Sequence, residues 1–477
     1  MAKNILIFAD GTGQVGGMRP DQQLSNVYKL YRATRVGPDS PINPTEQVSF
    51  YDPGIGTASA SGVVRLELWQ SVRSFVSQVF GLGFSRNLIE CYEAILKHYE
   101  PGDRIYLIGF SRGGYTVRAL ANVLNQCGVP ESDGKGGPFP RAGLTLRSIA
   151  TEAVRTVYEH GSGWPRKTFD AQRERKALLF RKKYDVPGDE NRADVHPEFV
   201  GVFDAVAALG VPMVQRIAAI VAALVVLGGL GWAIERWTTW QPQWSGWEWA
   251  LMTAGVGGLL AFLTFIALTI RWAPSGVGGW PFHLAFWRVK DYDRYLDYRI
   301  PIVRHALAID ETRRHFGRVE WGGGKNNNRF TDGRPHLWQL WFAGNHSDIG
   351  GSYAEDESRL SDIALKWMLD EATCGRNPIY VDKTKLRLYP DSFGPQHSEP
   401  FSAQNGSRLR RLAPWPEKDR EISDTADLHP SVIARLRAES VPSCGRKVIY
   451  RPLSLRGHKY LGEFFGVQPG AKKINTQ

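Results

Sequence analysis

The residues best suited to chemistry lie in a G-x-S-x-G motif at positions 109–113. An apolar run at 105–108 precedes the motif and predicts a buried strand, and apolar residues at helical spacing follow it. A serine on a sharp strand-to-helix turn has an exposed hydroxyl, and the helix N-terminus favours a developing negative charge. We therefore predict that Ser111 is a nucleophile. The competing interpretation is a glycine-rich turn that only packs a strand against a helix.

A nucleophilic serine needs a base and an acid that orients the base, and two later strand ends supply candidates. The apolar run 198–203 ends at Asp204, after the serine, where serine hydrolases of the α/β type place their acid. A second apolar run leads into a glycine-rich loop that carries His346 and Asp348. The chain order predicts that His346 accepts the proton of Ser111 while Asp204 orients the imidazole. Asp348 is the alternative acid, and a capping role for either aspartate is the competing interpretation.

An oxyanion hole is expected beside the N-terminal strand. The first apolar run, 4–9, ends in Asp10, Gly11 and Thr12, and a glycine-containing loop at a strand end suits ligand binding. We expect the backbone N–H group of Arg112 and one from this loop to stabilise the oxyanion, with Asp10 close by. A tight turn with a side-chain-to-backbone bond at Asp10 explains the segment equally well.

These residues require a scaffold that brings the ends of several strands together. Apolar runs alternate with helical patterns from residue 4 to 124, which is typical of a parallel sheet covered on both faces. We predict an α/β-hydrolase-like, mainly parallel sheet in residues 1–211 and 273–372, with a cap or surface insertion at about 145–190. Residues 302–316 are predicted to form a helix with a charged, exposed face.

Composition narrows the functional classes. The chain has 477 residues, of which 43% are hydrophobic, so it can bury a sizeable core. Its four cysteines lack paired or C-x-x-C spacing and indicate neither a disulfide framework nor a zinc site, and we expect no metal or cofactor. The net charge of +11, without an RNA-binding signature, favours anionic bilayer headgroups over nucleic acid. The N-terminal apolar run is too short for a signal peptide.

Two uncharged stretches, 217–234 and 250–270, interrupt the later part of the chain. Each is about long enough to cross a hydrocarbon core of roughly 30 Å, and tryptophans cluster beside them as in an interfacial belt. Arg216 precedes the pair and Arg271 follows it. We therefore predict a transmembrane hairpin over 212–272, with both termini and the hydrolase on the cytoplasmic side of the inner membrane. A buried helical hairpin in a protein core is the competing interpretation.

Several segments together resemble the phospholipase effectors of type VI secretion systems and related bacterial and fungal α/β-hydrolases. They are Asp10–Thr12, Tyr51–Thr57, the G-x-S-x-G motif, Phe203–Val206, His305–Glu311 and Trp341–Gly351. The resemblance spans residues 1 to about 370 and implies a triad of Ser111, Asp204 and His346 with phospholipase A-type ester hydrolysis. Phe203 stands where the family usually has tryptophan. The basic extension at 373–477 matches nothing in the family, so the effectors' secretion and docking functions are not carried over.

The sequence therefore predicts a membrane-anchored serine esterase that hydrolyses glycerophospholipid acyl esters. Its expected partners are a phospholipid bilayer and its glycerophospholipids, with no nucleic acid and with protein partners left open. An antibacterial role and a defence role both fit. One alternative is a non-catalytic, membrane-disrupting hairpin protein on a hydrolase-like scaffold. Another is a housekeeping lipase or thioesterase.

Overall fold

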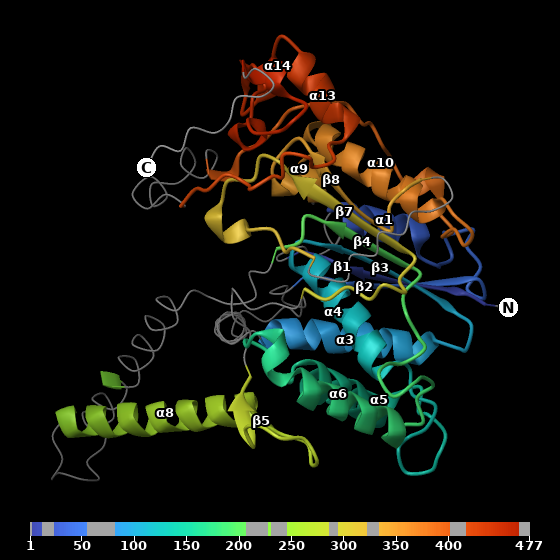
Figure 1. The fold of residues 1–477 in the computed structure, drawn as a ribbon, viewed down its shortest axis with the longest axis vertical. Helices are drawn as coiled ribbons and strands as arrows, with labels where there is room; N and C mark the ends of the chain where they lie inside the picture. The colour runs from blue at the N-terminus through green and yellow to red at the C-terminus, as the bar shows by residue number, and fades with distance from the viewer. Residues whose placement is uncertain are drawn as a thin grey trace.

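A six-stranded sheet forms the centre of the protein, seen here in a computed structural model (Figure 1). The structure describes residues 2–11, 23–54, 82–206, 228–229, 246–285, 294–321, 333–400 and 416–466. The sheet strands are β1 (Asn4–Ala9), β2 (Gln47–Asp52), β3 (Arg104–Phe110), β4 (Phe199–Phe203), β7 (Ile302–Ala308) and β8 (Leu337–Phe342). They pair in the order β2-β1-β3-β4-β7-β8, and every pairing is parallel.

Helices cover both faces of this sheet (Figure 1). One face packs against α3 (Leu82–His98) and α4 (Arg112–Cys127). A further layer of α5 (Gly143–Thr151), a π-helix (Glu152–Tyr158) and α6 (Arg166–Lys183) packs on these two helices. The other face packs against α1 (Asn26–Thr34) and α10 (Arg359–Thr373). The central strands are buried on both sides, which is why β1, β3 and β4 read as nearly continuous apolar runs. The predicted parallel sheet with helices on both faces is confirmed.

The prediction of a helix over 302–316 is wrong, because Ile302–Ala308 is the strand β7 between β4 and β8. The charged residues at 310, 311, 313 and 314 that suggested an exposed helical face come after this strand. Arg304 is buried and forms an ion pair with Glu371 of α10, from far along the chain. After the strand, Glu311 is buried and Asp310 is half-buried. The sequence pattern did not show that Arg304 lies in a central strand, because its partner Glu371 is remote in sequence.

The predicted transmembrane hairpin is not supported. Among the described residues, no helix is long and apolar enough to cross a membrane. The stretch 250–270 belongs mostly to α8 (Gly246–Thr269), in which glycines and threonines recur between the apolar side chains. Most of 217–234 lies outside the described residues. The prediction rested on the absence of charge, and the orientation at the inner membrane that depended on it stays a prediction.

Helix α8 extends away from the sheet and its covering helices (Figure 1). At its C-terminal end the chain enters a short antiparallel hairpin of β5 (Ile270–Trp272) and β6 (Phe282–Leu284). His283 of this hairpin accepts a hydrogen bond from the backbone of Gly161 at 3.1 Å. The hairpin therefore attaches α8 to the segment between the π-helix and α6.

The C-terminal extension packs against the β8 edge of the sheet (Figure 1). It contains α13 (Pro430–Arg437), β9 (Val441–Ser443), β10 (Arg446–Val448) and α14 (Gly462–Phe465). Trp341 of β8 exchanges backbone hydrogen bonds with it, accepting from His429 at 2.9 Å and donating to Asp427 at 3.0 Å. Apolar side chains of the extension share a core with Leu307 and Trp341. The extension is thus built onto the same sheet that carries the predicted site.

The turn between β3 and α4 requires its glycines. Ser111 lies there with φ 58° and ψ −124°, a strained conformation for a residue with a side chain. A Cβ on Gly109 would overlap the backbone of Gly113, and a Cβ on Gly113 would overlap the carbonyl group of Ala9. The glycines therefore let the start of α4 lie directly against β1 and β3.

We expect Gly113→Ala to lower the free energy of unfolding by about 1–3 kcal/mol, because the carbonyl group that its Cβ meets belongs to a central strand and cannot move aside. Urea denaturation measures the change. The matched control is Gly457→Ala, at an exposed glycine with nothing within 4 Å of an added Cβ, which should change stability by less than about 0.5 kcal/mol. Equal stability of the two variants would contradict the close approach.

Candidate active site

Ser111 lies at the carboxyl end of β3 and is the N-cap residue of α4. Its side chain is largely buried, with 7% of the residue exposed. Its N–H group donates to the carbonyl oxygen of Phe203 at 3.0 Å, and its own carbonyl oxygen accepts from Val206 at 3.3 Å. The serine turn is thereby joined to the end of β4, where Asp204 lies.

The structure brings Asp204 and His346 into direct contact. His346 is the first residue of α9 (His346–Gly350), which follows β8, and its Nδ1 lies 2.6 Å from Oδ2 of Asp204. Oδ1 of Asp204 accepts the N–H of Ala308 at the end of β7, at 3.1 Å. Both residues are buried, His346 with 4% and Asp204 with 0% of its surface exposed. A carboxylate in this position favours the tautomer with the proton on Nδ1 and leaves Nε2 as a base.

Ser111 and His346, the predicted nucleophile and base, are not hydrogen bonded to each other. Nε2 of His346 is buried and has no hydrogen-bond partner among the described residues. The ring of Phe110, the residue before Ser111, packs on the imidazole with centroids 4.6 Å apart. The hydrogen bond between a catalytic base and its nucleophile is often long in the absence of substrate and shortens when substrate binds.

Two further contacts fix the position of His346. Glu311, which follows β7, accepts the backbone N–H of His346 at 3.3 Å and is itself paired with Arg313 at 2.7 Å. The ring of Phe316 lies edge-on to the imidazole, with centroids 5.1 Å apart. Burial acts to raise the pKa of Glu311, but the hydrogen bond and charge of Arg313 outweigh it and the pKa is lowered. Glu311 is therefore an ionised support for the histidine backbone.

Asp204 is held in its charged form. Its complete burial acts to raise its pKa, but the charge of Arg420 and the hydrogen bond from His346 outweigh burial and hold the pKa below its ordinary value. Nη2 of Arg420 lies 2.9 Å from Oδ2, the same oxygen that His346 contacts. Sequence reasoning missed Arg420, which lies in the basic extension without a recognisable motif.

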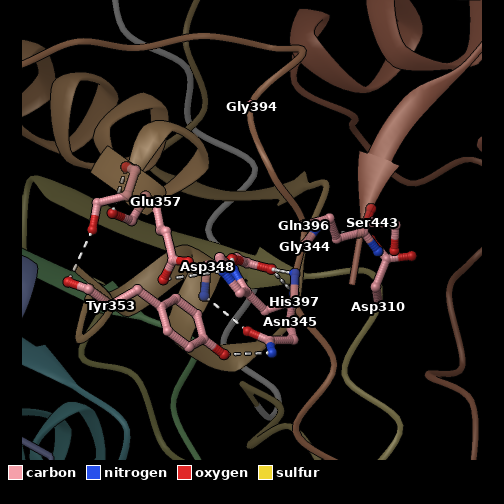
Figure 2. Close-up of polar contacts among 12 residues, drawn as sticks. Asp310, Gly344, Asn345, Asp348, Tyr353, Glu357, Gly394, Gln396, His397 and Ser443 are labelled. Carbon is pink, nitrogen blue, oxygen red and sulfur yellow. Dashed lines mark hydrogen bonds and ion pairs between the residues drawn. The ribbon is translucent and has the colours of Figure 1, made fainter. Parts of the chain in front are cut away.

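Asp348, the alternative acid, lies on the other side of the turn that carries His346. It forms a capping box with Asn345, in which each side chain accepts the backbone N–H of the other, at 2.9 and 3.0 Å. Its second oxygen contacts Nδ1 of His397 at 2.7 Å, as Figure 2 shows. Among the described residues, the carboxylate that contacts the His346 ring is that of Asp204. Asp348 shapes the turn instead.

His397 comes from the C-terminal extension and was not predicted. The ring of Tyr353 stacks on it with centroids 3.8 Å apart, and the Tyr353 hydroxyl accepts from Asn345 at 2.9 Å (Figure 2). Burial acts to lower the pKa of His397, but the hydrogen bond with Asp348 outweighs it and the pKa is raised. The pKa of Asp348 is itself raised by burial. This cluster therefore couples the extension to the start of α9.

The predicted oxyanion loop is described only in part. Thr12 lies outside the described residues. The N–H of Gly11 donates to the side chain of Asp10 at 2.7 Å, which is the bond that a simple tight turn predicts. Asp10 also accepts from Ser25 and, at 2.8 Å, from Tyr51, and burial raises its pKa to about 6 against these hydrogen bonds. Asp10 thus supports the loop, and the oxyanion role stays a prediction.

Arg112 is the first residue of α4, directly after the serine. Its side chain is partly buried, and this burial lowers the pKa of its guanidinium to about 10. Because Arg112 begins a helix, its backbone N–H group is among those without an intrahelical carbonyl partner. That position is where the predicted mechanism requires an oxyanion donor.

Known proteins resemble this chain over parts of their length. The uncharacterized protein YEL023C of Saccharomyces cerevisiae is 34% identical over 131 residues, which are 27% of this chain and 18% of that protein. A crystal structure of an uncharacterized protein from Pseudomonas aeruginosa is 17% identical, covering 81% of this chain and 47% of that chain with a TM-score of 0.32. The Tle1 effector bound to the VgrG spike from the Type 6 secretion system is 16% identical. The match covers 76% of this chain and 53% of that chain, with a TM-score of 0.31. This chain thus spans about half or less of each protein's length.

Most of the sequence also matches a protein family. Residues 3–250 and 256–371 match the catalytic domain of the Tle1-like phospholipase effectors of type VI secretion systems. The matched residues include Ser111, Asp204 and His346, and they end before the C-terminal extension. The resemblance that the motifs indicated is confirmed, and the chain belongs to the Tle1-like family of type VI secretion phospholipase effectors.

Proposed function

We propose that this protein is a phospholipase that cleaves the acyl esters of glycerophospholipids, with Ser111 as its nucleophile. The observation that carries the proposal is the buried contact of 2.6 Å between His346 and Asp204, at the sheet edge where the serine turn lies. A histidine oriented by a buried carboxylate, near a serine on a strained turn, suits acyl transfer. Membership of a phospholipase effector family directs that chemistry to lipid esters.

The proposed reaction has two halves. Ser111 Oγ attacks the acyl carbonyl carbon while Nε2 of His346 takes the hydroxyl proton, and the imidazolium then gives that proton to the departing glycerol oxygen. Water enters, loses a proton to His346 and attacks the acyl carbon. The imidazolium returns that proton to Ser111 Oγ as the bond to the acyl group breaks and the fatty acid leaves. Asp204 stabilises each imidazolium through Nδ1. The backbone N–H of Arg112 and the N-terminus of α4 stabilise the oxyanion.

We also propose that α8 contacts the surface of the bilayer from which the substrate comes. The helix carries large apolar side chains that are exposed, among them Leu260 at 59% and Leu263 at 53%. Monomeric proteins rarely expose contiguous apolar surface of this kind without a binding partner. The net charge of +11 favours an anionic lipid surface as that partner.

Replacing the nucleophile should abolish ester hydrolysis. We expect Ser111→Ala to reduce fatty-acid release from mixed phosphatidylcholine and phosphatidylglycerol vesicles by at least about 10⁴-fold, the loss typical of a triad nucleophile. Ser423→Ala, at an exposed serine of the extension, is the control and should keep full activity. Mass spectrometry of the remaining lysophospholipid assigns the ester position. Undiminished vesicle damage by Ser111→Ala would favour the non-catalytic, membrane-disrupting alternative.

Removing apolar side chains from α8 should separate vesicle hydrolysis from soluble ester hydrolysis. We expect Leu260→Gln with Leu263→Gln to reduce vesicle hydrolysis at least about 10-fold, because each leucine contributes about 1.5–3 kcal/mol when it leaves water. Hydrolysis of a short-chain soluble ester should remain within about 2-fold of wild type. Leu453→Gln, at a leucine 69% exposed outside α8, is the control. Equal losses on both substrates would contradict a lipid-contact role.

A further inference from the structure

The region that matches the phospholipase family ends at residue 371, but the catalytic centre does not end there. Arg420, from the extension, donates from Nη2 to Oδ2 of Asp204 at 2.9 Å. His346 donates from Nδ1 to that same oxygen at 2.6 Å. One carboxylate oxygen therefore receives two donors, one from the matched catalytic domain and one from the segment beyond it.

The contact between Arg420 and Asp204 is buried. Arg420 is 7% exposed and Asp204 is 0% exposed. A guanidinium is seldom buried without an anionic partner, because removing its charge from water is costly. Nη1 of Arg420 has no hydrogen-bond partner among the described residues, so the position of this side chain depends on Asp204.

Backbone pairing delivers Arg420 to this place. Residues 416–418 run antiparallel to the segment that follows β7: Arg313 pairs with Glu417, and the N–H of Lys418 donates to Thr312 at 2.7 Å. The N–H of Arg314 donates to the carbonyl oxygen of Pro416 at 3.0 Å. The position of Arg420, close after this pairing, is therefore set by backbone hydrogen bonds and not by its own ion pair alone.

The extension reaches two more carboxylates around the histidine turn. His397 contacts Asp348, which caps the start of α9 (Figure 2). The hydroxyl of Tyr450 donates to Asp310 at 2.9 Å, and Asp310 also accepts the N–H of Gly344 at 2.7 Å. The extension is thus anchored on both sides of the turn that carries the catalytic histidine.

We propose that Arg420 is a positioning residue of the triad, which holds the carboxylate of Asp204 toward His346 and places a positive charge behind it. The inference rests on the proposed function, because it concerns the same serine, histidine and aspartate. Arg420 has two effects on catalysis. Holding the carboxylate aligned speeds proton transfer, whereas its positive charge opposes the positive charge that develops on the imidazolium.

Other charged and titratable groups also face the triad. Glu311 contacts the backbone of His346 and is paired with Arg313. His305 accepts the N–H of Ala205 at 3.3 Å, and burial lowers its pKa to about 3, so it stays neutral across the working pH range. Arg118 donates to backbone carbonyl groups of Val319 and Glu320. None of these groups contacts the Asp204 carboxylate among the described residues, so a change in pH dependence on replacing Arg420 reports its own charge.

The test measures hydrolysis of p-nitrophenyl butyrate by the full chain as a function of pH. We expect Arg420→Gln to lower kcat about 10- to 100-fold with KM within about 2-fold of wild type, since only proton transfer is misaligned. The acid limb of its kcat/KM profile should move about 0.5–1 unit to higher pH, because the imidazolium loses a nearby positive charge. Arg420→Lys keeps the charge, so its acid limb should stay at the wild-type position while kcat recovers in part.

Controls separate positioning from general stability. Arg437→Gln, at an exposed arginine of α13, should match wild type in rate and pH profile. In an Asp204→Asn background, Arg420→Gln should change kcat by less than about 2-fold, because the residue acts through Asp204. Should Arg420→Gln fail to show a cooperative thermal transition, Arg420→Lys is the test: a lowered kcat with the acid limb in place supports the inference, and a wild-type kcat contradicts it.

Three results would overturn the inference. An unchanged rate and pH profile for Arg420→Gln would remove any role for the residue. A full additional loss in the Asp204→Asn background would show an effect that does not pass through the triad acid. A wild-type chain that neither hydrolyses esters nor reacts at Ser111 with a fluorophosphonate probe would overturn the proposed function and this inference with it.

Discussion

A fully buried, ionised carboxylate at Asp204 is the constraint on which the rest of the site depends. Removing such a charge from water costs several kcal/mol unless donors replace its hydration. Here the donors are Nδ1 of His346, Nη2 of Arg420 and the N–H of Ala308. They come from the start of α9, from the C-terminal extension and from the end of β7. The site can form only when these separate parts of the chain have folded onto one sheet edge.

The direction of the strands explains why local sequence signals located part of this site. All strands of the main sheet are parallel, so the residues that follow β3, β4 and β8 emerge at the same edge. Ser111, Asp204 and His346 each follow one of these strands directly or within a short loop. An apolar run followed by a functional residue type is visible in sequence without any knowledge of tertiary contacts. The strand ends and the chain order of the three residues were therefore predictable.

What the sequence did not reveal depends on partners that are remote along the chain. Strand β7 was interpreted as part of a helix because the charged residues at 310–314 that follow it fitted an exposed helical face. Arg304 is acceptable in a central strand because it is paired with the buried Glu371, which is remote in sequence. Arg420 and His397 lie in polar, motif-free sequence, and their roles come from the buried aspartates that they contact. The hairpin prediction drew on the length and lack of charge of two stretches and on the tryptophans and arginines beside them, but no helix among the described residues is long and apolar enough to cross a membrane.

The point at which sequence similarity to the family ends is not the point at which the structural unit ends. The family match ends at residue 371, yet the segment beyond it supplies donors to Asp204, Asp348 and Asp310. Breaking one buried charged pair costs about 3–5 kcal/mol, which is a large share of the 5–15 kcal/mol that stabilises a typical domain. Detaching the extension would remove donors from all three carboxylates and uncover the apolar core around Trp341. The extension and the sheet that carries the candidate site therefore share buried contacts, and the geometry of His346 depends on both.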